Sequence, residues 1–408
     1  MPSVPPEGEP APADGALPPQ ALAGMGERTF SLYLHVPFCA VRCGYCDFNT
    51  YTAAELGSAP GASRQAYLDA VRRELELAVT VLAADSQQPV PAVDTVFFGG
   101  GTPTLLATDE LAGLLGAVRD TFGLVPGAEI TTEANPESVD QRGLEQLVAA
   151  GFNRLSLGMQ SSVPHVLQVL DRRHTPGRVG QVVGWARAAG FGSVSLDLIY
   201  GSPGESRADW RTSLRSALDL QPDHLSAYSL IVEPGTRLAA RIRRGELPGI
   251  DDDVHAEYYL VAEEELTAAG LAWYEVSNWA RPGHACRHNL AYWRGGNWWG
   301  VGPGAHSHVG GVRWWNLRHP SRYSARLAGG QSPAEAREVL DDQQRRVERV
   351  LLELRLAEGL ELAVLTPTEA RRVPTIVAAG WGLADAGRLR LTLPGRLLAD
   401  GIVRDLLD

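Results

Sequence analysis

The segment Cys39-Ala-Val-Arg-Cys43-Gly-Tyr-Cys46 places three cysteines in the spacing CxxxCxxC, directly after a run that alternates apolar and polar residues. Three thiolates are one fewer than a closed iron–sulfur or zinc site normally takes from a protein. The fourth metal position is therefore left for another ligand. The spacing alone also allows a structural zinc site with His35 or Cys286 as fourth ligand, whereas a disulfide would leave one clustered cysteine unpaired.

Short apolar runs alternate with amphipathic segments from about residue 30 onward. We expect strands at 31–36, 95–98, 129–133, 154–159, 193–199 and 224–230. Helices fill the intervals, among them one capped by Ser63, one capped by Thr108 and one over residues 206–218. This rhythm predicts a parallel sheet, in which ligand-binding residues lie at the carboxyl ends of the strands.

Several polar residues fall at the ends of these strands. The loop Gly99-Gly100-Gly101-Thr102-Pro103-Thr104 follows the second strand, where bare backbone can approach a ligand, although such a loop is as often a tight turn. Glu133 ends the third strand, Gln160 ends the fourth, and Arg172 lies in the helix that follows. Asp197 lies inside an apolar strand, where a charge is costly unless paired. An Arg172 ion pair with Asp197 or Glu133 is the structural alternative to ligand binding.

The cysteine segment resembles the radical S-adenosylmethionine enzymes, whose CxxxCxxC loop holds a [4Fe–4S] cluster with one iron open to the cofactor. Tyr45 fits the aromatic residue that this superfamily usually carries before the last cysteine. The strings Tyr33-Leu-His-Val-Pro-Phe-Cys39 and Cys46-Asp-Phe-Asn49 are similar to the oxygen-independent coproporphyrinogen III oxidase family. The oxidase itself carries a fourth cysteine two residues after the third, where this chain has Phe48. The string from Cys46 to Asn49 is instead typical of the haem-chaperone branch of that family.

The resemblance implies an α/β fold, a partial (β/α)6 radical-SAM barrel with a small C-terminal winged-helix-like domain. It also implies that Cys39, Cys43 and Cys46 hold the [4Fe–4S] cluster. It implies S-adenosylmethionine at residues on or near the strand ends, namely Tyr33, Tyr45, Gly100, Gly101, Thr102, Glu133, Gln160, Arg172, Asp197 and Ile231. It assigns no residue as catalytic, because the cofactor carries the difficult step.

A second string, from His288 to Trp293, matches the HNxxYW signature of the haem-chaperone branch. A neutral imidazole can ligate haem iron, and tyrosine and tryptophan rings can stack on a porphyrin. Guanidinium groups can pair with the propionates, and Arg287 and Arg294 flank the string. The motif in its family context implies a haem site at His288, Asn289, Tyr292 and Trp293. The alternative is a histidine that is simply buried or at the surface beside aromatic rings.

Other histidines and the fourth cysteine are weaker candidates. Cys286 is interpreted as a small buried apolar residue, although its position two residues before His288 also allows a haem thiolate or a metal ligand. His35, His306 and His308 remain as haem or cluster neighbours.

Four segments follow from composition and pattern. Residues 1–27 form a leader rich in Pro and Ala, which we expect to be disordered because it cannot bury enough apolar surface. Residues 28–270 form the barrel, and residues 271–331 form the HNxxYW region and connector. Residues 332–408 form the C-terminal domain, interpreted as a lid or partner-docking module, with helices at 338–354 and 369–380, a break at Pro374, a strand at 388–393 and a closing helix at 395–407.

The overall composition narrows the class of protein. The 408 residues, 44% of them hydrophobic, can bury one barrel-sized domain and a smaller one. The net charge of −11 argues against nonspecific nucleic-acid binding. Four cysteines do not make a disulfide scaffold, and we expect a cytoplasmic protein with no membrane span.

The sequence therefore favours a haem chaperone that binds haem and delivers it to an acceptor haemoprotein. The [4Fe–4S] cluster and S-adenosylmethionine would support homodimerisation or transfer, with or without turnover. The alternative is an enzyme, the oxidase that decarboxylates two propionates of coproporphyrinogen III to give protoporphyrinogen IX. Two observations distinguish these functions: the residue at position 48, which is a cysteine in the oxidase, and the product, because a divinyl porphyrinogen accumulates only if the protein is the oxidase.

Overall fold

The computed structural model describes residues 8–23, 25–57, 61–84, 89–172 and 175–408. The strands of its larger sheet are β1 Glu9–Pro10, β2 Phe30–Val36, β3 Val93–Gly100, β4 Leu124–Ala134, β5 Arg154–Gln160, β6 Ser193–Tyr200, β7 His224–Ser229, β8 Ala272–Glu275, β9 Asn278–Ala280, β10 Asn297–Val301, β11 His306–Val309, β12 Val312–Asn316 and β13 Ala334–Val339. They pair in the order β1-β13-β12-β11-β10-β2-β3-β4-β5-β6-β7-β9-β8. The six strands from β2 to β7 are adjacent, parallel and in chain order, as the sequence predicts.

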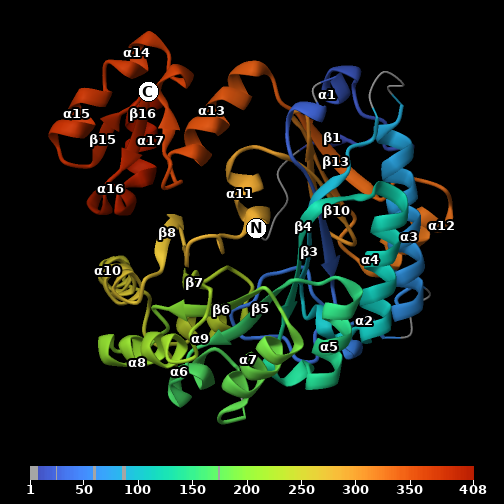
Figure 1. The fold of residues 1–408 in the computed structure, drawn as a ribbon, viewed down its shortest axis with the longest axis horizontal. Helices are drawn as coiled ribbons and strands as arrows, with labels where there is room; N and C mark the ends of the chain where they lie inside the picture. The colour runs from blue at the N-terminus through green and yellow to red at the C-terminus, as the bar shows by residue number, and fades with distance from the viewer. Residues whose placement is uncertain (1–7, 24, 58–60, 85–88, 173–174) are drawn as a thin grey trace.

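Helices connect these strands, and most of them cover the outer side of the sheet, whereas α11 lies against the inner-face residues Thr95 and Phe97 of β3. They are α1 Pro19–Ala23, α2 Ala53–Leu56, α3 Arg64–Leu82, α4 Thr108–Phe122, α5 Gln141–Ala150, α6 Pro164–Val169, α7 Arg178–Ala189, α8 Arg207–Leu218, α9 Arg237–Arg243, α10 Asp252–Ala268, α11 Arg287–Trp293 and α12 Pro320–Ala328. Figure 1 shows α3, α4, α5 and α7 around the outside of the strands. This is the α/β arrangement that the resemblance implies, with the parallel series continued by β10 beside β2 and by antiparallel β9 beside β7.

The helix caps follow local hydrogen-bonding chemistry. Ser63 caps α3 as predicted, because its hydroxyl accepts a hydrogen bond from the Ala66 amide at 3.1 Å. Thr108 was expected to cap the next helix, but it is the first residue of α4, and the cap is Ala107. The Glu110 carboxylate accepts a hydrogen bond from the Ala107 amide at 2.7 Å, which is the reciprocal half of a capping box. Asp109 Oδ1 takes the place of the missing hydroxyl, because it accepts from the Glu110 amide at 3.1 Å.

Residues on the two faces of the parallel strands differ in polarity. On β6, Val194, Leu196 and Leu198 are fully buried in the main core with the outer helices, whereas Ser195 and Asp197 face the other strands' polar side chains. Parallel strands covered on both faces usually read as continuous apolar runs. Here the inner face is polar, and it is therefore suited to a charged ligand rather than to a dry core.

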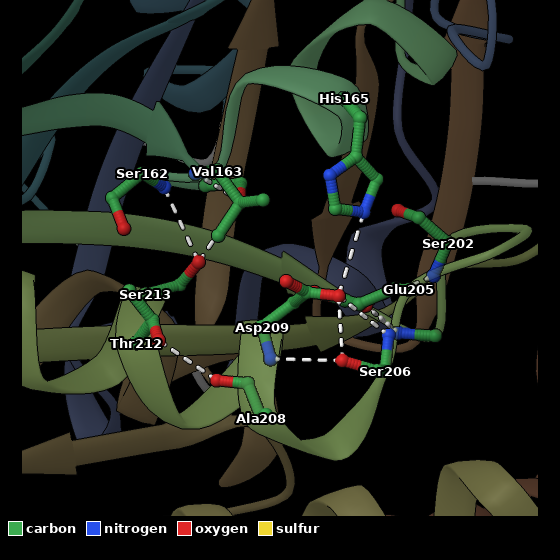
Figure 2. Close-up of polar contacts among 12 residues, drawn as sticks. Ser162, Val163, His165, Ser202, Glu205, Ser206, Ala208, Asp209, Thr212 and Ser213 are labelled. Atoms are coloured by element: carbon green, nitrogen blue, oxygen red, sulfur yellow. Dashed lines mark hydrogen bonds and ion pairs between the residues drawn. The ribbon is translucent and has the colours of Figure 1, made fainter.

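The loop after β6 is anchored to the start of α8. Figure 2 shows Ser206 and Asp209 closing the first turn of α8, with the Ser206 amide 2.9 Å from Asp209 Oδ2. The Ser213 hydroxyl accepts a hydrogen bond from the Ser162 amide at 3.2 Å, which ties the loop after β5 to the same helix. His165 lies on the outer surface, with Nε2 3.4 Å from Asp209 Oδ2. The carboxyl ends of β5 and β6 are thereby fixed relative to each other.

The predicted disordered leader is wrong for the described residues from 8 to 23. β1 pairs with β13, and α1 buries Ala21 and Leu22 against the main core. Met25 is also buried. These few apolar side chains anchor a segment whose composition alone would not fold. Residues 1–7 and 24 of the same prediction lie outside the described residues.

The C-terminal domain has its own core and lies on one side of the barrel (Figure 1). Its elements are α13 Asp342–Glu353, β14 Leu360–Glu361, α14 Pro367–Ala370, α15 Val373–Ala378, β15 Gly382–Asp385, β16 Arg388–Leu391, α16 Leu393–Leu397 and α17 Ala399–Leu407. The β15–β16 hairpin after three helices gives the winged-helix-like order that was expected. Pro374 restarts a helix, as predicted, near the beginning of α15.

Three boundaries in this region differ from the prediction. The helix expected from residue 338 begins at Asp342, because residues 334–339 pair with β12 as strand β13. The compact domain therefore starts nearer 342 than 332. The predicted strand at 388–393 ends at Leu391, and the closing helix is divided into α16 and α17. No helix among the described residues has the length and apolar character needed to span a membrane.

Candidate functional site

The cysteine loop lies at the carboxyl end of β2. The Cys39 amide donates to the Tyr51 carbonyl at 3.0 Å, and the Cys46 amide donates to the Cys43 carbonyl at 3.3 Å. All four cysteines of the chain are free, and the three in this loop are partly exposed. No group of three or more His, Cys, Asp or Glu side chains in the described ranges is arranged to hold a single metal ion.

Hydrogen-bond donors surround the three sulfur atoms. Burial raises the pKa of Cys39 and raises that of Cys46 to about 11, so both free thiols are protonated at neutral pH. The nearby hydroxyls of Thr50 and Thr102 oppose this increase in the pKa of Cys39, and the Phe48 backbone does the same at Cys46. Donors of this kind stabilise anionic sulfur. The loop therefore fits a thiolate-ligated iron–sulfur group.

The glycine loop packs directly against the cysteine loop. The Gly101 amide donates to the Val36 carbonyl, and the Thr102 amide donates to the Phe38 carbonyl, each at 2.8 Å. A Cβ on Gly101 would lie 2.4 Å from the Phe38 carbonyl oxygen. A Cβ on Gly100, whose φ is 111°, would lie 2.5 Å from the His35 ring. These glycines are required because the two loops touch.

Two partly buried carboxylates lie on the inner face below this loop. Glu133 Oε2 accepts from the Gly100 amide at 3.0 Å, and burial, together with the charge of Asp197, raises the pKa of Glu133 to about 8. Asp197 accepts from the Ser156 and Ser226 hydroxyls, each at 2.8 Å. Burial raises the pKa of Asp197, and these hydroxyls oppose the increase. Serines, rather than an arginine, therefore hold Asp197.

Arg172 does not form either of the ion pairs considered from the sequence, and no salt bridge joins it to Asp197 or Glu133 in the described structure. It lies beyond the end of α6 and not within that helix. Its Nη2 donates to the Gly158 carbonyl at 2.9 Å, and its Nη1 lies 3.6 Å from Cys43 Sγ. Nε is buried without a hydrogen-bond partner among the described residues. A buried guanidinium nitrogen left in this way fits a ligand that supplies an acceptor.

The other residues predicted for S-adenosylmethionine occupy the same end of the barrel. Gln160 ends β5 with a φ of 65°, in the left-handed region that non-glycine residues rarely adopt. The Tyr33 hydroxyl lies 3.0 Å from His35 Nδ1. Tyr45 packs against the apolar cluster beside Cys43, and Ile231, just beyond β7, is 67% exposed. The fold therefore brings the ten predicted residues and the cysteine loop to one end of the sheet.

His288 lies elsewhere, near the amino end of β3. Its Nδ1 is 2.7 Å from the Thr95 hydroxyl, and its Nε2 is 2.8 Å from the Tyr292 hydroxyl. The side chain is 1% exposed and stacks on Phe97. Burial lowers the pKa of His288 to about 3. Both ring nitrogens are therefore engaged, and the imidazole presents no free lone pair to a haem iron in this structure.

The rest of the HNxxYW string also makes internal contacts. Asn289 and Trp293 lie beside the buried carboxylate of Glu275 and oppose the increase in its pKa that burial causes. The guanidinium of Arg287 donates to the Gly127 and Asp94 carbonyls at 2.8 and 3.0 Å. Arg294 forms a bidentate pair with Glu358 of the C-terminal domain at 2.7 and 3.0 Å. The string that was expected to hold haem therefore clamps α11 between the barrel and the C-terminal domain.

The remaining candidates are placed as follows. Cys286 is buried as interpreted, with Sγ 3.6 Å from Glu129, and burial raises its pKa to about 12. His35 directs Nε2 to the Asn49 carbonyl at 2.9 Å. Neither residue is a free fourth ligand for the cysteine loop. The serines that hold Asp197 were missed from the sequence, although the alternation of polar residues along β5 and β7 could have indicated them.

Comparisons with known proteins show which family and fold the chain resembles. The radical SAM superfamily matches residues 33–217. The chain is 53% identical over 386 residues to heme chaperone HemW of Mycobacterium tuberculosis, covering 95% of this chain and 97% of that protein. It is 36% identical to heme chaperone HemW of Synechocystis, over 85% of this chain and 82% of that protein. Among solved structures, coproporphyrinogen III oxidase (HemN) from Escherichia coli superposes with a TM-score of 0.78 at 24% identity, over 95% of this chain and 92% of that one.

Proposed function

Because the chain belongs to the HemW family of radical SAM proteins, we propose that it is a haem chaperone that binds haem and transfers it to an acceptor haemoprotein. The observation that carries the proposal is the 53% identity over almost the full length of both chains. The likeness to the oxidase, at 24% identity, concerns the fold alone. Phe48, in place of the oxidase's fourth cysteine, supports the same choice.

We further propose that the carboxyl end of the barrel holds a [4Fe–4S] cluster through Cys39, Cys43 and Cys46. The donors around these sulfurs and the unpartnered Nε of Arg172 support an anionic group there. S-adenosylmethionine would bind beside the cluster, in contact with the ten residues predicted for it at this end of the sheet. When bound, the pair supplies one-electron reductive chemistry. The protein's own part is to orient the ligands, and to hold a proton on Glu133, whose pKa burial raises to about 8.

Two assays on one anaerobic preparation test the function. The cluster is reconstituted, iron and sulfide are measured, and haemin is titrated while the absorption spectrum is recorded. Coproporphyrinogen III is then offered with S-adenosylmethionine and a reductant, and the porphyrins are separated. Stable haemin binding, haem transfer to apo-haemoproteins of the same cell and no decarboxylation are the expected results. Decarboxylation without stable haem binding would assign the protein to the oxidase branch.

A further inference from the structure

The loop that carries the three cysteines is closed at its base. The Cys39 amide donates to the Tyr51 carbonyl at 3.0 Å, and Phe38 pairs with Tyr51 as a single parallel β-bridge. Thr50 directly precedes this bridge and follows Cys46 by four residues. The chain therefore returns beside the first cysteine of the loop, and Thr50 lies on the returning segment between the last cysteine and the bridge.

The hydroxyl of Thr50 is buried, and no described group forms a hydrogen bond with it. The residue is fully buried, and Oγ1 is one of the buried side-chain atoms that lack a partner among the described residues. Its backbone, in contrast, is satisfied, because the amide donates to the Phe48 carbonyl at 2.7 Å and the carbonyl accepts from the Arg42 guanidinium. A buried hydroxyl left in this way indicates an acceptor that the polypeptide does not itself supply.

The sulfur atoms of Cys39 and Cys46 lie beside this hydroxyl. Thr50 is close enough to both sulfurs to lower the pKa of each thiol, although its geometry is not that of a hydrogen bond to either. A thiol sulfur is only a weak acceptor, whereas a thiolate that ligates a metal carries negative charge and attracts donors more strongly. Thr50 is therefore placed to donate a hydrogen bond when the cysteines ligate a cluster.

The neighbouring Asn49 fixes the position of Thr50. Its Nδ2 donates to the carbonyls of Pro303 and Arg318 at 2.9 and 2.8 Å. A Cβ on Gly304 would lie 2.6 Å from Asn49 Nδ2, so this glycine is what lets the two segments touch. These partners precede β11 and α12, outside the residues 33–217 that match the radical SAM superfamily. A later part of the chain therefore holds the returning segment of the cysteine loop.

A donor at this place has a defined electrostatic effect. Hydrogen bonds to the sulfur ligands are among the factors that set the reduction potential of an iron–sulfur cluster. Reduction adds negative charge, so a donor stabilises the reduced form more than the oxidised form and raises the potential. Removal of the donor should therefore make the cluster harder to reduce.

We infer that Thr50 tunes the reduction potential of the cluster by donating a hydrogen bond from its hydroxyl to a cysteine sulfur, and that Asn49 is the positioning residue that holds it there. The inference rests on the proposed [4Fe–4S] cluster. Thr50 and Asn49 are outside the residues predicted to bind the cluster or S-adenosylmethionine. No covalent bond forms or breaks at Thr50, which acts only on the one-electron couple of the cluster.

Matched variants of the full chain test the inference. The cluster is reconstituted anaerobically, iron and sulfide are measured, and the reduction potential is determined by titration with dithionite followed by electron paramagnetic resonance. Thr50→Val removes the hydroxyl and keeps the shape, whereas Thr50→Ser keeps the hydroxyl. Thr131→Val is the control, because the Thr131 hydroxyl in β4 is also buried without a partner among the described residues. Asn49→Ala releases the anchor, and its control is Asn153→Ala, which removes similar hydrogen bonds to residues 128 and 130.

We expect Thr50→Val to keep the wild-type iron content and to lower the reduction potential by about 59 mV, a tenfold change in the equilibrium constant for one electron. Thr50→Ser and Thr131→Val should keep the wild-type potential. Asn49→Ala should lower the potential of the wild type and cause no further change in Thr50→Val. Asn153→Ala should lower the stability of the protein and leave the potential unchanged.

A wild-type potential in iron-loaded Thr50→Val would overturn the inference. Equal shifts in Thr50→Val and Thr50→Ser would do the same, because the hydroxyl would then not be the cause, and so would equal shifts in Thr50→Val and Thr131→Val. An unchanged potential in Asn49→Ala would overturn the positioning role of that residue. A wild-type protein that takes up no iron and sulfide would instead reject the proposed cluster.

Discussion

Replacement of His288 by alanine tests whether the HNxxYW helix is a structural clamp. The change removes two hydrogen bonds, those to Thr95 and Tyr292, and the ring stack on Phe97. Thr95 keeps its bond to Ser31, so the Tyr292 hydroxyl is the group that loses its partner. An orphaned buried polar group costs about 1–3 kcal/mol, and the lost stacking and the cavity add about 1–2 kcal/mol. We therefore expect a loss of about 3 kcal/mol of unfolding free energy.

Thermal and urea denaturation measure this loss, with haemin titration on the same samples. In a chain this long, a loss of this size corresponds to a lowering of the melting temperature by about 3–4 °C. Thr95→Val, which removes one of the same hydrogen bonds, should cost about 1 kcal/mol and couple to His288→Ala in a double-mutant cycle. His165→Ala is the exposed control. Unchanged stability together with abolished haem binding would refute the clamp and return His288 to the role of iron ligand.

Three further predictions concern other parts of the molecule. Glu74 is fully buried, and burial raises its pKa to about 7, so the stability it contributes is complete below pH 4.5 and is lost as pH rises through 7. The wild type should lose about 3 kcal/mol relative to Glu74→Gln between these limits, and parallel pH profiles of unfolding would contradict this. Arg172→Gln should lower the affinity for S-adenosylmethionine at least tenfold and leave the iron content unchanged. Equilibrium dialysis and iron analysis measure the two quantities, and an affinity equal to that of the wild type would exclude a role for Arg172 in binding S-adenosylmethionine. Gly101→Ala should push against the cysteine loop, which reduces iron incorporation and lowers the free energy of unfolding by about 2 kcal/mol. The control Gly116→Ala has open space around it in α4 and should be neutral or slightly stabilising. Equal iron incorporation in the two variants would show that the loops do not interact as described.

The elements that the sequence predicted are those with a strong local signal. The six parallel strands and the Ser63 cap follow from periodicity and capping chemistry, which depend on neighbours in the chain. The boundary at residue 338 was misplaced because pairing with β12 overrides local helical propensity. The prediction that the leader is disordered was wrong for a similar reason. Two residues of α1 are buried against the main core, and this tertiary packing folds a segment whose composition alone predicts disorder.

The sequence by itself determined the chain order of the parallel strands, and it predicted the ligand types and, through the spacing of Cys39, Cys43 and Cys46, an open metal position. Only the tertiary structure decided which groups remain free to bind. Hydrogen bonds between distant segments engage both nitrogens of His288, whereas Nε of Arg172 has no hydrogen-bond partner among the described residues. The serines at Asp197 and the acceptors of Arg172 likewise come from strands that are far apart in the chain. A motif specifies residue types, but the lone pairs and donors available for binding depend on what the fold has already paired.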